Sequence, residues 1–372
     1  MARLETVRVL LALAAHHRWE VHHMDVKSAF LNGDLSEEVY VVQPPGFAVV
    51  GEEHRVLKLH KALYGLCQAP RAWRGDESTF LLVGVYVDDL VITGTDQGLI
   101  SEFKEQMKKL FKMSDLGLLS YYLGIELLKL RKEDGGELFD PTLYRSVIGS
   151  LRYLVNSRPD IAHAVGIVSR FIEQPSTHHW AAVKQVLRYV KGTLNYGCRY
   201  VAVRGEVELV GYSDSDHAGN IEDRKSTSGN VFFLGNNLVT WCSRKQKVVA
   251  LSSCEAEYVA AAAATCQGVW LSHLVSEMLG KPPAKFKLFV DNQAAIALSK
   301  NPVHHDRSKH INIKYHYIRD CVETGQLEVD HIRTREQLAD TLTKALGRVT
   351  FVEMWQKLSM VKVGAGDQSL RG

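Results

Sequence analysis

The order of elements between residues 205 and 350 constrains the fold more than any other feature of this sequence. Three short apolar runs, "VELVGYS", "GNVFFLG" and "NLVTWCS", are separated by Gly and Asn turns and predict an antiparallel meander. An Ala-rich helix follows from Ser252 to Gly280, and "KFKLFV" and "QLEVDHI" then each predict a strand that leads into a helix. Strands that alternate with helices indicate parallel neighbours and right-handed crossovers. Residues 205–350 are therefore predicted to form a mixed α/β domain.

The rest of the chain divides into three parts. Residues 1–135 combine apolar strands with an amphipathic helix at 1–19 and a charged helix at 97–111, which is typical of an α+β domain. Residues 136–204 predict a helical segment, and residues 351–372 a C-terminal tail. The helices of that segment are expected at Thr142–Val155, Pro159–Ile172 and Thr177–Lys191, with Pro159 first in its helix and Ser176 or Thr177 as a cap. The fold class is α/β overall.

Charge is spread unevenly along the chain, although the net charge is only +3. The segment from Pro141 to Arg204 contains nine Lys and Arg residues against two acids, Asp160 and Glu173. Such an excess is expected where a surface meets a polyanion, and it is equally typical of solvated helix faces. Both interpretations stay open from composition alone.

Cysteine spacing and the length of the hydrophobic runs indicate in which cellular compartment the protein is expected. The six cysteines show no C-x-x-C spacing, so neither a zinc site nor a disulfide framework is predicted. No apolar run has the length needed to cross a bilayer, so no membrane role is expected. With no signal peptide in front, we expect an intracellular protein, in the cytoplasm or the nucleus.

Two adjacent aspartates, Asp88 and Asp89, interrupt the apolar run "GVYVDDLVITG". A turn between two hydrophobic strands projects both carboxylates from its tip, where they repel each other unless a cation lies between them. Hard divalent ions such as Mg²⁺ prefer oxygen ligands, and Asp25 in the strand "HHMDVKSAF" offers a third carboxylate. Alone, Asp25 is typical of a strand end and the pair is typical of a turn. Together they predict a metal site, with the aromatic Phe30 nearby to pack beneath a sugar.

A second set of carboxylates lies in the mixed α/β region. Asp214 ends its first strand and Asp291 its fourth, and acids at the carboxyl ends of strands converge on a crevice. The long helix offers Glu255 and Glu257. Residues 252–255 have the S-x-x-E pattern of a capping box, which gives Glu255 a structural role and favours Glu257 as a ligand.

The last predicted helix, "REQLADTLTKAL", adds Asp340 to this set. We expect Thr334 and Gln337 to form the capping box that starts the helix. His331, at the end of the preceding strand, is suited to shuttling protons or helping product leave, and it is equally typical of a surface histidine at a strand end.

The motifs resemble the reverse transcriptase and RNase H region of the Pol polyprotein of copia-type LTR retrotransposons. The polymerase part of the resemblance lies in "WEVHHMDVKSAFLNGDLSEEVYVVQPPGF", "VLKLHKALYGLCQAPRAW" and "VYVDDLVITG". It continues through "DPTLYRSVIGSLRYLVNSRPDIAHAVGIVSRF" and then into "GYSDSDHAGNIEDRKSTSGNVFFLG", "SSCEAEYVAAAAA", "LFVDNQAAI" and "ADTLTK". It covers nearly the whole chain. The implied parts are a polymerase palm remnant at 1–135, a connection segment at 136–204 and an RNase H-like domain at 205–350.

The resemblance implies two enzyme sites, each with two Mg²⁺ or Mn²⁺ ions. The metal ligands would be Asp25, Asp88 and Asp89 in the polymerase, and Asp214, Glu257, Asp291 and Asp340 in the RNase H. Phe30 would exclude a ribose 2′-hydroxyl, and Gln68 would contact template or nucleotide, with Arg71 and Tyr86 as further contacts. The implied partners are an RNA template, an RNA–DNA hybrid and, for an active polymerase, dNTPs. The oligomeric state is not predicted.

Two basic stretches are candidates for contact with the nucleic-acid backbone. Arg307 and Lys309 lie among histidines in "NPVHHDRSKHINIKYH", a spacing that favours phosphate contact over zinc. Arg224 and Lys225 lie in the turn "DRKSTSG", which is suited to a phosphate and equally typical of a solvated hairpin turn.

The pattern of the family is broken at two joins. Only "RGDEST" separates Trp73 from Phe80, where the resembled palm needs a helix, a turn and a strand. The stretch "YYLGIELLKLRKEDGGELFD" is also short, and the resemblance starts after most of the fingers. We therefore expect DNA synthesis to be lost and RNA cleavage in hybrids to survive. The alternatives are a non-catalytic nucleic-acid-binding remnant, and a decayed or mis-spliced reading frame.

Overall fold

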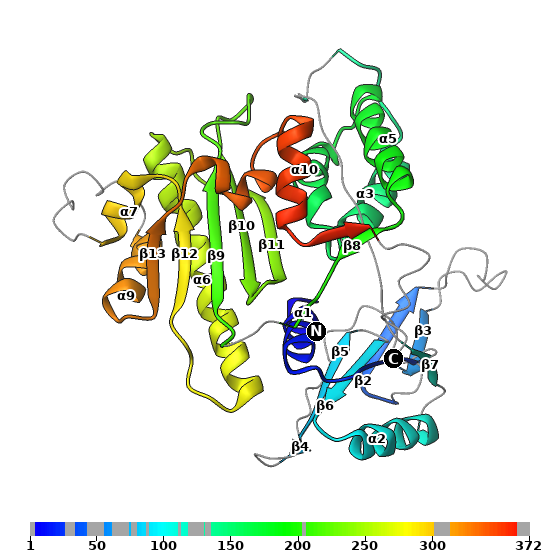
Figure 1. The fold of residues 1–372 in the computed structure, drawn as a ribbon. Helices are drawn as coiled ribbons and strands as arrows, with labels where there is room; N and C mark the ends of the chain where they lie inside the picture. The colour runs from blue at the N-terminus through cyan, green and yellow to red at the C-terminus, as the bar shows by residue number, and fades with distance from the viewer. Residues whose placement is uncertain are drawn as a thin grey trace, which may run out of the picture. The chain divides into compact units, whose positions relative to one another are not determined.

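The computed structural model divides the chain into two compact units (Figure 1). The first contains residues 1–10 and 18–119, and the second contains residues 11–17 and 120–372. The structure describes residues 4–26, 34–42, 56–61, 74–75, 80–86, 89–110, 113–117, 130, 135–202, 206–300 and 313–362. Within these ranges, no helix is both long and apolar enough to cross a membrane.

The first unit is built on an antiparallel sheet with the strand order β4-β5-β6-β1-β7. These strands are β4 (Arg74–Gly75), β5 (Phe80–Tyr86), β6 (Asp89–Gly94), β1 (Val21–Val26) and β7 (Met113–Gly117). Helix α2 (Gln97–Leu110) packs against β6 and β7, and β2 (Asp34–Val42) pairs with β3 (Val56–Lys61). Helix α1 (Leu4–His17) precedes them. The predicted strands around the aspartates and the charged helix are confirmed.

The second unit contains a five-stranded mixed sheet with the order β11-β10-β9-β12-β13. Strands β9 (Leu209–Ser215), β10 (Thr227–Leu234) and β11 (Asn237–Lys245) form the predicted antiparallel meander. Strands β12 (Phe286–Val290) and β13 (Leu327–His331) are parallel to each other, and β12 is parallel to β9. The predicted mixed α/β fold is confirmed.

One face of this sheet is covered by helices that lie between its strands in the sequence. Helix α6 (Ser253–Leu279) packs on β9, β10 and β12, and Figure 1 shows it behind the strands. Helices α7 (Gln293–Lys300) and α9 (Tyr317–Glu323) pack against α6 and β13. The predicted limits of α6 hold, because Ser252 caps its first turn and Gly280, at φ 63°, ends it in the left-handed conformation.

The opposite face is covered by segments that lie far apart in the sequence. Its buried apolar side chains come from α4 (Ala162–Val168), β10, β11, the 3₁₀ segment Leu338–Leu342, α10 (Arg348–Lys357) and β14 (Met360–Lys362). Strand β14 pairs with β8 (Tyr196–Cys198). Helices that precede and helices that follow the sheet in the sequence therefore pack into the same core on this face. The predicted domain boundaries at 204 and 350 stay predictions.

The basic segment forms helices at the predicted positions, with one difference. Helix α3 (Pro141–Val155) is capped by Asp140, and α5 (Thr177–Gly192) is capped by Ser176. The predicted helix Pro159–Ile172 is instead α4 between two short 3₁₀ turns, Pro159–Ile161 and Ser169–Phe171. A buried ion pair accompanies the first turn, where Arg158 Nε lies 3.0 Å from Asp160 Oδ1.

Candidate active site

Three carboxylates of the second unit lie together at one end of the mixed sheet. Asp214 lies near the end of β9, Asp291 directly follows β12, and Glu257 lies in the second turn of α6. One oxygen of each lies within 4.8 Å of one oxygen of each of the others. The structure thus brings together three of the four residues predicted for this site, from three different elements.

The position of Glu257 is fixed by the end of β9. Its Oε1 accepts a hydrogen bond of 2.9 Å from the backbone N–H of Ser215. The side chain of Glu257 is buried, and its Oε2 has no hydrogen-bond partner among the described residues. An unpaired buried carboxylate oxygen is costly, which fits an oxygen that receives a cation.

The side chain of Glu255 has a structural role at the start of α6. Its backbone N–H donates to Ser252 Oγ at 3.1 Å, and its Oε2 accepts from the backbone N–H of Leu251 at 2.7 Å. Both bonds stabilise the start of α6. Glu257 and not Glu255 is therefore the acid of this helix that lies in the carboxylate group.

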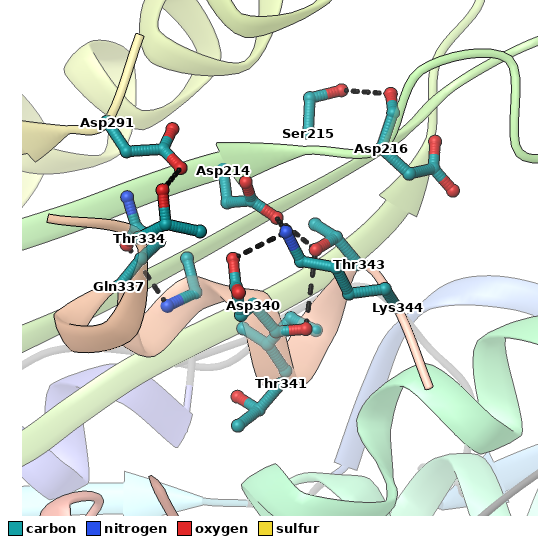
Figure 2. A network of polar contacts seen from close by, with 12 residues as sticks. Asp214, Ser215, Asp216, Asp291, Thr334, Gln337, Asp340, Thr341, Thr343 and Lys344 are labelled. Carbon is teal, nitrogen blue, oxygen red and sulfur yellow. Dashed lines mark hydrogen bonds and ion pairs between the residues drawn. The ribbon is translucent and has the colours of Figure 1, made fainter. Parts of the chain in front are cut away.

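Asp340 approaches the group from a turn that carries a lysine. Lys344 Nζ lies 2.9 Å from Asp340 Oδ1 and 3.7 Å from Asp214 Oδ2. The hydroxyl of Thr343 donates to the same Asp214 oxygen. Figure 2 shows the amino group of Lys344 between these two carboxylates, with Asp291 further along the group. Sequence analysis did not single out Thr343 or Lys344, although the motif "ADTLTK" contains both.

The predicted helix around Asp340 is wrong, and so is its capping box. Residues 334–336 and 338–342 form two 3₁₀ turns. The Thr334 hydroxyl donates to Asp291 Oδ2 at 3.2 Å, and the Gln337 side chain donates to the backbone oxygen of Ser213 at 2.9 Å. Thr334 thus contacts Asp291 and caps no helix. Gln337 holds the segment against β9 and also caps the second 3₁₀ turn, since its Oε1 accepts from the backbone N–H of Ala339 at 3.3 Å.

A buried glutamine joins the elements that carry Asp214 and Glu257. Gln246 Nε2 lies 3.1 Å from Ser215 Oγ, 2.9 Å from Ser228 Oγ and 2.9 Å from the backbone oxygen of Ala256. These contacts bring the ends of β9 and β10 to the start of α6. No motif signalled Gln246, because its role depends on the tertiary fold.

Burial and mutual repulsion raise the pKa values of these acids. Burial, followed by the charges of Asp214 and Asp291, raises the pKa of Glu257 to about 9. Burial and Asp214 raise the pKa of Asp340 to about 7, although Lys344 opposes the shift, and burial also raises the pKa of Asp291. Excess negative charge of this kind is relieved by a cation. The oxygen-only donor set and the unpaired Glu257 Oε2 fit a hard divalent ion.

In the first unit, the structure brings together the backbones of two predicted ligands. Asp25 in β1 lies directly opposite Asp89 in β6. Strands β5 and β6 form a hairpin in which Tyr86 pairs with Asp89. Asp88, Phe30, Gln68 and Arg71 lie outside the described residues. The predicted hairpin is confirmed, and the roles of its residues stay predictions.

The other predicted contacts lie around the second unit. The backbone of His331 pairs with Val290, which precedes Asp291, and its side chain is exposed. Arg224, with φ 54°, is exposed in the turn before β10, where Asp223 Oδ2 lies 2.8 Å from Lys245 Nζ and 3.7 Å from Lys225 Nζ. Arg307 and Lys309 lie outside the described residues. Both interpretations of His331 and of the turn stay open.

Comparison with known proteins identifies the family of this chain. The family model for reverse transcriptase (RNA-dependent DNA polymerase) matches the chain in two segments, residues 1–80 and 74–138. The retrovirus-related Pol polyprotein of transposon TNT 1-94 from Nicotiana tabacum is 38% identical, over 94% of this chain and 32% of its own length. The retrovirus-related Pol polyprotein of transposon RE2 from Arabidopsis thaliana is 37% identical, over 96% of this chain and 29% of its own length. The chain spans about a third of the length of these relatives.

Among solved structures, the N-terminal RNase H domain of Rv2228c from Mycobacterium tuberculosis, a fusion with maltose-binding protein, aligns with 41% of this chain and 98% of its own. The TM-score is 0.27 and the identity 13%. The sequence relatives, not this likeness, define the class: retrovirus-related Pol polyproteins, with a region that matches the reverse transcriptase family. The chain belongs to the Pol polyprotein family of copia-type retrotransposons.

Proposed function

We propose that this chain hydrolyses the RNA strand of RNA–DNA hybrids at the group formed by Asp214, Glu257, Asp291 and Asp340. The observation that supports the proposal is the convergence of the first three carboxylates within 4.8 Å, from three elements of one sheet domain. Family membership supports the substrate class, since reverse transcription produces such hybrids.

Each residue of the group has a distinct part in this proposal. Asp214, Glu257 and Asp291 would hold Mg²⁺ or Mn²⁺, which supplies charge neutralisation at a phosphate and activation of water when bound. Thr334 fixes the Asp291 carboxylate, and the Ser215 N–H fixes that of Glu257. Thr343 and Lys344 fix Asp214 and Asp340. Restraints of this kind keep the carboxylates in place before substrate binds.

The full chain should therefore cleave the labelled RNA strand of an RNA–DNA hybrid in the presence of Mg²⁺. Changing Asp291→Asn should lower the rate by more than about a hundredfold, because several kcal/mol of charge stabilisation are lost. The matched control is Asp320→Asn, which makes the same change at an exposed position of α9. Equal rates for the wild type and Asp291→Asn would contradict the proposal.

A second candidate function is binding of nucleic acid without catalysis. It is favoured by five basic side chains that are exposed on α3 and α5: Arg145, Arg152, Lys184, Arg188 and Lys191. Contacts between such side chains and phosphates release counterions, which makes affinity depend steeply on salt.

Hybrid binding should thus weaken as salt rises, and a variant with Arg152, Lys184 and Arg188 changed to Gln should reduce the log–log salt slope by about 2–3. Fluorescence anisotropy with a labelled hybrid measures both slopes. The control changes Gln185, an exposed neutral residue of α5, to Ala and should keep the wild-type slope. A slope that is near zero, or equal in both variants, would contradict a role for this surface.

A further inference from the structure

The ammonium group of Lys344 lies close to two carboxylates of the candidate site. It contacts Asp340 Oδ1 at 2.9 Å and Asp214 Oδ2 at 3.7 Å. The side chains of these acids are 9% and 2% exposed, so their charges are poorly solvated and depend on a positive partner. Figure 2 shows the lysine reaching both from one side.

The lysine is held there by the backbone of its own turn. The backbone N–H groups of Thr343 and Lys344 both lie 3.2 Å from the backbone oxygen of Asp340. Thr343 is buried, and its hydroxyl is bonded to Asp214. The i,i+4 pair with Asp340 is thus part of an ordered turn rather than a chance contact on a solvated surface.

On the opposite side of the group, neither Glu257 nor Asp291 forms an ion pair with a described residue. Asp214, Glu257 and Asp291 have mutually close oxygens, and Asp340 is not a member of that close set within the described ranges. Glu257 is 5% exposed and its Oε2 lacks a hydrogen-bond partner among the described residues. Asp340 Oδ1 also lacks a hydrogen-bond partner of good geometry among the described residues, but it lies 2.9 Å from the Lys344 ammonium group. The two sides therefore differ in the presence of a lysine, not in their hydrogen bonds.

We propose that Lys344 takes the place of one of the two divalent ions expected at such a site, so that this group binds a single divalent ion. A second divalent ion beside Asp214 and Asp340 would face the ammonium charge at close range, where like charges repel strongly. The single ion is held by Asp214, Glu257 and Asp291. This inference rests on the proposed function only in taking the bound ion to be Mg²⁺ or Mn²⁺.

The test counts bound Mn²⁺ by electron paramagnetic resonance of the free ion, with the full chain at saturating Mn²⁺. Asp25, Asp88 and Asp89 are changed to Asn in every sample, so that the predicted polymerase site does not bind an ion. We expect one bound ion with Lys344 present and two in Lys344→Met. Lys344→Arg keeps the positive charge and should bind one ion.

Adding Asp340→Asn to Lys344→Met should return the count to one, which assigns the additional ion to Asp340. If the protein with Lys344 binds two ions, the proposal is overturned whatever the variants do. It is also overturned if Lys344→Met binds only one ion while its circular dichroism spectrum shows that it is folded. The hybrid-cleavage assay is separate. If cleavage depends on Asp291 but Lys344→Met binds no additional ion, only the role of Lys344 is refuted. If Lys344→Met gains an ion but the protein does not cleave the hybrid, only the proposed activity is refuted.

Discussion

His163 is a half-buried titratable residue of α4 that contacts the turn carrying Asp340. Its Nδ1 lies 3.2 Å from the backbone oxygen of Leu342, in the 3₁₀ segment that contains Asp340. Burial and the nearby charge of Arg170 lower the pKa of His163 to about 4. The imidazole is therefore neutral in the folded protein at neutral pH, and it donates through Nδ1 to Leu342.

This shift predicts a loss of stability in acid. Between the unfolded pKa of about 6.5 and the folded value of about 4, only the unfolded chain gains a proton at His163. Its contribution is complete above pH 6.5 and is lost as pH falls, up to about 3 kcal/mol. Urea unfolding from pH 7.5 to 4.5 measures the effect. His163→Asn retains a donor without titrating, so its free energy of unfolding should fall less; parallel curves for the two proteins would refute this.

At the scale of elements, the candidate site depends on how closely β10 approaches the turn that carries Asp340. Gly229 lies opposite Asp214 in the sheet. A Cβ atom there would lie 2.9 Å from the backbone oxygen of Ala339 and 2.8 Å from Cγ2 of Thr343. Both distances are shorter than real contacts allow, so the absence of a side chain permits residues 338–342 to lie on the strand.

Gly229→Ala should push this turn away from β10. We expect a cost of about 1–3 kcal/mol in urea unfolding, as for other overpacked sites. Hybrid cleavage should also fall, because Asp340, Thr343 and Lys344 move together. Gly149→Ala in α3 is the matched control, since its Cβ meets nothing within 4 Å and Ala stabilises a helix by up to about 1 kcal/mol. Equal stability of the two variants would show that the turn tolerates displacement.

The same turn shows what the sequence could and could not predict. The three-strand meander and the limits of α6 follow from local signals, namely apolar runs between turns, the Ser252 cap and the Gly280 stop. The capping pattern at Thr334 and Gln337 is also local, but Thr334 bonds to Asp291, and Gln337 bonds to Ser213 as well as to Ala339 in its own turn. A polar side chain in such a pattern serves a helix start or a tertiary contact equally well. Only the fold decides between them.

The carboxylates of the candidate site could also be predicted from local patterns, whereas the residues that contact them could not. Acids at strand ends meet wherever the sheet forms, so Asp214 and Asp291 follow from the strand pattern. The contacts of Lys344 and Gln246 depend on segments that meet only after folding. The sequence thus predicted the charged group itself and missed the residues that position it.

At the scale of the whole molecule, the two predicted enzyme sites differ in how completely the chain supports them. The family model for reverse transcriptase matches in two segments that meet at residues 74–80. The same residues are the join at which the sequence lacks a helix of the resembled palm. The alignment to the Nicotiana tabacum relative runs over 423 positions, more than the 372 residues of this chain, so part of that relative has no counterpart here.

This difference predicts that one activity survives without the other. A palm that lacks a core helix loses packing worth more than the roughly 5–15 kcal/mol that stabilises a domain, so Asp25, Asp88 and Asp89 would not be held for catalysis. The full chain should therefore fail to extend a labelled primer on an RNA template with dNTPs and Mg²⁺ or Mn²⁺, while it cleaves the RNA of a hybrid in the same buffer. Extension that disappears in Asp89→Asn would contradict this prediction, because it would show that the paired aspartates of β1 and β6 still form a working polymerase site.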